Sequence, residues 1–242
     1  MIKSPIIHDR HLVKNYYENM VLNNMHKNSF KLPEDLTIIT CRNSGTMEDR
    51  IIDSLSGYEY KSILECSLEY LGIEGLVVLR DDRLPWRNTF KIEMVKNYLD
   101  LCTTRYVMFC DAIDVIFIDD PNRVIEIFKS HHCKMLFMST TATSGYSCMP
   151  EVYKWVTGIS KSRFLNSGVW IGNTEFVKTV FAEASKYINP HGATMYERES
   201  YIASSPKSYP IGGDDQDILR YIEPLFYPDL KVDYKNELAY RS

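Results

Sequence analysis

The chain has 242 residues and a mass of 28.2 kDa, a size that fits one α/β domain or a domain with a small appendage. Hydrophobic residues make up 45% and charged residues 25%, as in ordinary globular proteins, which excludes a disordered chain, a collagen-like repeat and a disulfide-rich miniprotein. Lys and Arg number 28 against 32 Asp and Glu, a net charge of −4. This balance argues against a general nucleic-acid binder with a basic face.

The two ends and the cysteines carry no targeting or redox signal. No stretch of the sequence approaches the ~20 apolar residues that span a bilayer, and the first ten residues lack the apolar core of a secretory signal. The six cysteines form no CxxC pair, so we interpret them as buried, reduced thiols. The sequence therefore predicts a cytoplasmic protein, unless it is a fragment of a longer chain.

The first half of the chain divides into an N-terminal extension and the start of a regular domain. Residues 1–33 are polar, with a short amphipathic helix around residues 13–22, and we expect them to form a peripheral extension to a domain of residues 34–242. Continuous apolar runs favour strands that are buried on both faces. The elements expected next are a strand at 36–41, a helix at 48–55 and a strand at 76–79.

Strands and helices alternate through the second half. Helical spacing of apolar residues predicts a helix over 90–102, followed by a buried strand at 106–110, and Pro121 opens a helix through residue 129. Further strands are expected at 135–138 and 169–171, with Thr174 as the cap of the next helix. Residues 190–210 show no period and indicate a mobile or substrate-facing loop. This alternation predicts an α/β fold, with a mostly parallel central sheet flanked by helices and a ligand site beyond the carboxyl ends of the strands.

Asp111 and Asp114 form a DxxD motif where the strand at 106–110 ends. Side chains three apart point to opposite faces of a straight strand, but a turn after Asp111 lets the two carboxylates converge. Converging carboxylates repel unless a cation lies between them, and oxygen ligands favour Mg²⁺ or Mn²⁺. Taken alone, the motif is more typical of two solvated loop acids, because a bare DxxD is common.

Two further polar motifs follow. Asn166, Ser167 and Gly168 precede an expected strand and offer compact hydrogen-bonding groups and a close backbone approach, although an ordinary turn would look the same. Asp214 and Asp215, in the segment GGDDQD, precede a short helix. The helix macrodipole favours acids at a helix start, but capping needs only one of them, and the surplus favours a polar substrate or a metal-bound water.

The ordered set of these motifs resembles the GT-A glycosyltransferases. The closest likeness, over residues 36–240, is to the glycosyltransferase domain of procollagen lysyl hydroxylases and the related collagen galactosyltransferases. The resemblance implies a GT-A type, Rossmann-like domain. It further implies a metal-dependent hexosyltransferase that moves a sugar from a nucleotide sugar, with UDP expected, to a hydroxyl of a glycan, a protein or another acceptor.

The resemblance also assigns roles to individual residues. Asp111 and Asp114 match the pair that binds Mn²⁺ (or Mg²⁺) and the diphosphate, and Asp214 and Asp215 match acids that face the donor sugar and the acceptor as catalytic groups. The residues assigned to the donor nucleotide and the sugar cleft are Thr40, Arg42, Lys91, Asp111, Asn166, Ser167 and Gly168.

Two departures from the family keep alternatives open. The family supplies a third metal ligand from a C-terminal HxNG-type histidine, which this sequence lacks before Ser242; His191, an additional water or residues outside the sequence could take its place. Met149 stands where the family has a tryptophan near the donor. The alternatives are a non-catalytic nucleotide- or glycan-binding module on the same scaffold and a metal-dependent phosphatase, whose two acids would have to be two apart.

Overall fold

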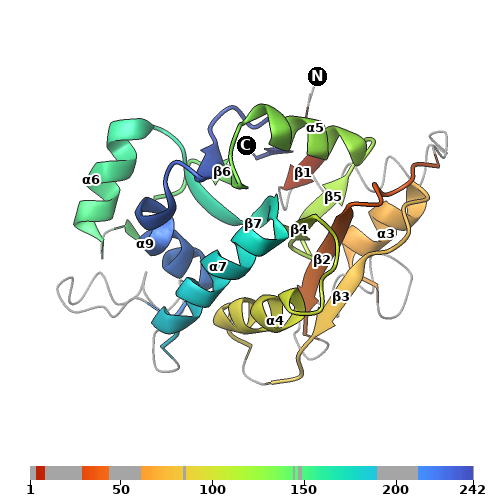
Figure 1. Ribbon diagram of the computed structural model, residues 1–242, viewed down its shortest axis with the longest axis horizontal. Helices are drawn as coiled ribbons and strands as arrows, with labels where there is room; N and C mark the ends of the chain where they lie inside the picture. Colours follow the sequence, from red (N-terminus) through yellow and green to blue (C-terminus); the bar gives the residue numbers. More distant parts are fainter. Residues whose placement is uncertain are drawn as a thin grey trace.

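A computed structural model describes residues 4–8, 29–43, 61–83, 86–143, 145–146, 149–189 and 212–241. Its centre is a six-stranded sheet in the order β3-β2-β4-β7-β6-β8, shown in Figure 1. Five of these strands run parallel, and β7 runs antiparallel to both of its neighbours. The expected α/β fold with a mostly parallel central sheet is confirmed. The sheet strands are β2 (Leu36–Arg42), β3 (Val77–Arg80), β4 (Tyr106–Cys110), β6 (Met135–Thr140), β7 (Phe164–Asn173) and β8 (Leu230–Asp233).

Helices cover both faces of this sheet. On one face, α4, α7 and α9 lie side by side (Figure 1) and bury apolar residues such as Val95, Val180 and Ile222 against Phe109 and Trp170 of the sheet. On the other face, α3 and α5 pack on a separate core that includes Leu64 and Phe128. The helices are α3 (Ile63–Tyr70), α4 (Thr89–Leu99), α5 (Asn122–Ser130), α6 (Pro150–Ile159), α7 (Thr174–Ala184), the 3₁₀ turn η2 (Ser185–Tyr187) and α9 (Asp215–Phe226).

A second, three-stranded sheet joins distant parts of the sequence. Its order is β5-β1-β9, with β1 (Ile6–His8) antiparallel to β5 (Val115–Phe117) and parallel to β9 (Ala239–Tyr240). Ile6 and Ile7 are fully buried. The peripheral position that we expected for the start of the chain is therefore wrong for residues 4–8, whereas the domain boundary at residue 34 stays a prediction.

Several predicted elements have shifted limits. β4 has the expected bounds, and the strand expected at 76–79 lies one residue later, at Val77–Arg80. β7 is much longer than the expected 169–171, because the polar residues before it continue the strand. The cap of α7 is Asn173, whose side chain accepts a hydrogen bond from the N–H of Phe176, and not Thr174.

Among the described elements, the sequence patterns missed the strands β1, β5, β8 and β9, the helices α3 and α6, and the 3₁₀ turn η2. The helices expected at 13–22 and 48–55, the loop expected at 190–210, and His191 lie outside the described residues.

Candidate active site

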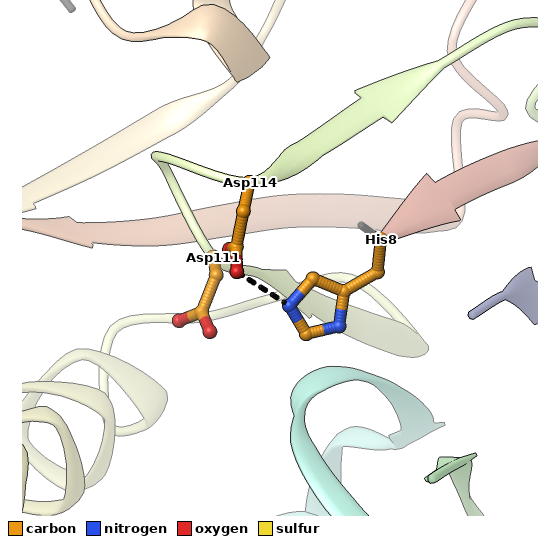
Figure 2. Close-up of side chains that lie close together, drawn as sticks. All are labelled: His8, Asp111 and Asp114. Carbon is orange, nitrogen blue, oxygen red and sulfur yellow. Dashed lines mark ion pairs between the residues drawn. The ribbon is translucent and has the colours of Figure 1, made fainter. Parts of the chain in front are cut away.

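Three side chains from two separated segments meet at the carboxyl end of β4. Asp111 directly follows β4, Asp114 directly precedes β5, and His8 is the last residue of β1. Because His8 pairs in register with Val115, the β1–β5 pairing places its ring beside Asp114. One ligand atom from each of these residues lies within 4.8 Å of the other two, and Figure 2 shows the three side chains gathered around one point. We call this set the His8 cluster.

The ring of His8 is held on both of its nitrogens. Nε2 lies 3.1 Å from Oδ2 of Asp114 (dashed in Figure 2), and Nδ1 lies 2.8 Å from the sulfur of Met138 on β6. The pKa of Asp114 is raised by burial and lowered more strongly by His8, so that its net pKa lies below the usual range. Nε2 is the ring nitrogen that faces Asp114.

An irregularity in β7 opens the space for this cluster. Phe137 of β6 pairs with Trp170, but the next residue, Met138, pairs with Asn166, so residues 167–169 of β7 bulge between them. Within the bulge, the carbonyl of Gly168 accepts a hydrogen bond from the N–H of Asp111. A Cβ at Gly168 would lie 2.3 Å from Cε1 of His8 and 2.8 Å from Oδ2 of Asp111. Only glycine fits there, because any side chain would displace both groups.

Asp111 divides its two oxygens between different partners. Oδ1 accepts a 2.7 Å hydrogen bond from Nζ of Lys91, whereas Oδ2 is the oxygen close to Gly168. Nζ of Lys91 also lies 3.9 Å from Oδ2 of Asp215. Burial alone would lower the pKa of Lys91, but the charges of Asp111 and Asp215 outweigh it and raise the net pKa above its usual value. Lys91 is thus a fixed positive charge beside the cluster.

Asp214 and Asp215 lie at the amino end of α9 and differ in their surroundings. Asp214 caps the helix, with Oδ1 accepting the N–H of Gln216 and Oδ2 accepting a 3.1 Å hydrogen bond from Asn88. Asp215 is buried, and burial raises its pKa to about 7 against the opposing charge of Lys91. One acid therefore serves as a hydrogen-bonded cap, and the other carries a proton that it can exchange near neutral pH.

Of the remaining predicted residues, Asn166 connects the β7 bulge to α9, whereas Thr40 and Arg42 lie outside the His8 cluster. Asn166 donates a hydrogen bond from Nδ2 to Oε1 of Gln216, and it accepts the N–H of Gly168, so it ties the bulge to α9. The hydroxyl of Thr40 donates to the carbonyl of Cys110, and the buried Arg42 lies 3.1 Å from Glu65 of α3. Thr40 and Arg42 mark the end of β2, and neither belongs to the His8 cluster.

His8 is the functional candidate that sequence reasoning missed. A histidine after two β-branched residues, at the end of a short strand, was the available signal, but three residues are too few for a periodic pattern. Strand β1 is defined only by its pairing with β5 and β9, which are more than 100 residues away in the sequence.

Residues 59–206 match the family model of the PLOD GT domain, and this match covers more than half of the 242 residues. The chain belongs to the PLOD GT domain family. It is therefore a glycosyltransferase-family domain, and its mixed α/β architecture is that of the GT-A fold. A search of curated proteins found no match to the sequence.

The PLOD GT match covers only part of the candidate site. Lys91, Asp111, Asp114 and the bulge of β7 lie inside the matched range, whereas His8 and the acids of α9 lie outside it. In the ranges that the structure describes, no helix has both the length and the apolar character needed to cross a membrane.

Proposed function

We propose that this PLOD GT domain is a metal-dependent hexosyltransferase that moves a sugar from a UDP-sugar to a hydroxyl acceptor. The observation that carries the proposal is the meeting of His8, Asp111 and Asp114 in a space kept open by Gly168. Breaking the bond between the sugar and UDP leaves negative charge on the diphosphate, so a transferase gains most from positive charge at that place.

The residues of the His8 cluster fit a divalent ion. Two carboxylates and one imidazole nitrogen, with ligand atoms within 4.8 Å of one another, form a mixed oxygen and nitrogen set that suits Mn²⁺ better than Mg²⁺, which prefers oxygen alone. Nδ1 of His8 can keep its proton towards Met138, which leaves Nε2 free to bind a metal. When bound, the ion would neutralise charge on the departing diphosphate.

Lys91 supplies the second positive charge in this proposal. Its hydrogen bond with Asp111 aims the ammonium at the carboxyl ends of the strands, and its raised pKa keeps it protonated over the physiological range. An ammonium held there by protein carboxylates needs no rearrangement when charge develops on the leaving group. The ends of β2, with Thr40 and Arg42, would then lie on the nucleoside side.

We assign Asp215 and Asp214 to the sugar and acceptor side. Asp215, with a pKa of about 7, is suited to take the proton of the acceptor hydroxyl. Asp214 is fixed by Asn88 and by its own capping bond, so it would hold a sugar hydroxyl. Asn166 and Ser167, joined to α9 through Gln216, would line the same cleft.

The test is a UDP-release screen over common UDP-sugars, with Mn²⁺ and with EDTA. We expect release with at least one donor in Mn²⁺ and none in EDTA, and a loss of at least about 100-fold in His8→Ala and Asp114→Asn, because one removed ligand weakens both metal binding and charge stabilisation. The matched controls are His132→Asn and Asp100→Asn, which change exposed residues and should keep wild-type rates. Equal release in EDTA, or UDP binding without release, would contradict the proposal.

A further inference from the structure

A cavity lies away from the His8 cluster. It has a volume of about 580 Å³ and is bounded by β8, the ends of α5 and α6, and the second half of α9. Glu223 of α9 lines it, eight residues after Asp215, which is about 12 Å along a helix. The cavity shares no lining residue with the His8 cluster, so it is a separate site, of the size at which small ligands bind.

Glu223 is a buried acid with an unfilled hydrogen-bonding position. The residue is 2% exposed, and its Oε2 has no hydrogen-bond partner in the described part of the chain. Burial raises the pKa of Glu223 to about 8 against the favourable charge of Arg220. Arg220, one turn earlier, donates instead to the carbonyls of Leu165 and Ala142. A buried polar oxygen without a partner is costly, and a ligand with O–H or N–H groups would remove that cost.

The remaining wall combines aromatic surface with three charged side chains, two of which already have partners in the protein. Tyr227 and Tyr234 contribute rings, Lys231 and Lys235 are positive, and Glu237 is negative. Nζ of Lys231 already donates to the carbonyl of His131 at 2.8 Å. Oε2 of Glu237 lies 3.1 Å from Nε2 of His131, and Glu223, whose pKa is raised to about 8 by burial, adds no charge near neutral pH. The lining favours a neutral ligand with many hydroxyls and an apolar face.

We propose that this cavity binds a saccharide, with a sugar hydroxyl donating to Oε2 of Glu223 and the apolar face of a ring lying against Tyr227 or Tyr234. Sugars combine hydroxyl donors with C–H surface, which is the combination that the lining presents. Binding itself does not depend on the proposed transfer reaction. A role in holding the remote part of an acceptor glycan rests on the proposed function.

A divalent ion at the rim is the competing occupant. Nε2 of His131 lies 3.1 Å from Oε2 of Glu237 and 3.9 Å from Oδ1 of Asp233, and these atoms form a second set of metal-ligand type. However, both oxygens of Asp233 accept backbone hydrogen bonds, from Lys235 and Leu238. Asp233 therefore already uses both oxygens to close the turn after β8, which favours the saccharide.

The experiment uses the full chain with Asp111→Asn, so that no transfer consumes the ligand. Calorimetric titrations with maltotriose, cellotriose, tri-N-acetylchitotriose and β-1,4-galactobiose should show binding of at least one of them. Glu223→Leu and Tyr227→Ala should each weaken that binding by about tenfold or more. Leu225→Ala, on the same helix and 63% exposed, should leave it within about twofold.

Three results would overturn the proposal. The first is that none of the four saccharides binds. The second is that binding survives both Glu223→Leu and Tyr227→Ala. The third is that the site binds Mn²⁺ or Zn²⁺ but no saccharide, and that His131→Asn abolishes this metal binding. Tyr227 is half-exposed, so its variant stays informative if Glu223→Leu fails to fold. UDP-sugar hydrolysis by Tyr227→Ala in the otherwise wild-type chain should be unchanged, which separates failure of this site from failure of the proposed function.

Discussion

Gly168 makes the most sensitive single-residue test of the candidate metal site. A methyl group there would lie 2.3 Å from Cε1 of His8 and 2.8 Å from Oδ2 of Asp111, so Gly168→Ala must push apart two of the three groups. We expect Mn²⁺ affinity to fall by about 10- to 100-fold, the size of effect seen when groups that orient metal ligands are changed. Titration of Mn²⁺ by electron paramagnetic resonance measures this directly.

The matched control is Gly158→Ala. Gly158 lies in α6, and a Cβ there would meet nothing within 4 Å, so the variant should keep full Mn²⁺ affinity and gain a little stability from better helix propensity. If both glycine variants bind Mn²⁺ as the wild type does, the His8 cluster is not the metal site.

The Lys91→Met variant distinguishes a role of Lys91 in stabilising charge on the leaving group from a role in metal binding. In Lys91→Met, Oδ1 of Asp111 loses the hydrogen bond of 2.7 Å from Nζ of Lys91. The carboxylate of Asp111 can then interact with a bound cation without competition from Lys91. We expect kcat for UDP release to fall by about 100-fold or more, while Mn²⁺ affinity stays the same or rises. Steady-state kinetics and Mn²⁺ titration on one preparation measure the two effects.

Lys96→Met is the control for this experiment, because Lys96 is an exposed residue of the same helix. It should change neither quantity. A parallel loss of kcat and of Mn²⁺ affinity in Lys91→Met would instead mean that the variant damages the site as a whole.

At the scale of elements, α9 carries residues of both sites, and its buried Glu223 makes the stability of the fold depend on pH. The pKa of Glu223 is raised from 4.5 to about 8 in the fold by burial, so the native state holds this proton more tightly than the unfolded state. Its contribution is fully present below about pH 4.5 and is lost as the pH rises through 8. Glu223→Gln has no such proton to lose. Its Tm relative to that of the wild type should therefore rise as the pH is raised from 5 to 8.5.

Thermal unfolding at several pH values measures this gain, with Glu126→Gln, an exposed residue of α5, as the control. The control should follow the wild type at every pH. A difference between Glu223→Gln and the wild type that is constant from pH 5 to pH 8.5 would show that Glu223 keeps no raised pKa in the folded protein.

Elements with a clear hydrophobic pattern of their own could be predicted from the sequence, whereas short strands that are defined by pairing with distant strands could not. β4 is a continuous apolar run, and the structure has it at the expected residues. In β1 and β5, three residues each, the hydrophobic pattern is too short to tell a strand from a loop. The polar residues Asn166 and Ser167 are as typical of a turn as of a binding site, and the sequence alone does not show that both lie in β7, because the bulge of residues 167–169 depends on the pairing of β7 with β6.

The same dependence on distant segments limits what the sequence alone could predict about the candidate site. The DxxD motif lies within one turn of chain, so its two acids could be proposed from the sequence alone. His8 reaches them only when the chain folds over more than 100 residues, and a local pattern holds no information about such a contact. Sequence reasoning therefore considered His191 or residues outside the sequence for a third ligand, and it had no means of pointing to His8.

At the scale of the whole molecule, the proposed metal binding at the His8 cluster would depend on folding of the chain. The ligands of this cluster come from β1 and from the β4–β5 turn, and the unfolded chain holds no such arrangement, so an ion that binds there stabilises only the native state. At a Mn²⁺ concentration 100 times its Kd the gain is about 2.7 kcal/mol. For a chain of this size, that corresponds to a rise in Tm of about 5–10 °C.

We expect this rise in the wild type and in Asp100→Asn, and its absence in His8→Ala and in Asp114→Asn. The His8 variant is the decisive one, since it alters a residue outside the range that matches the family model and leaves the DxxD motif intact. If Mn²⁺ raises the Tm of His8→Ala as much as that of the wild type, β1 contributes no ligand, and the ion is held by the two acids without it.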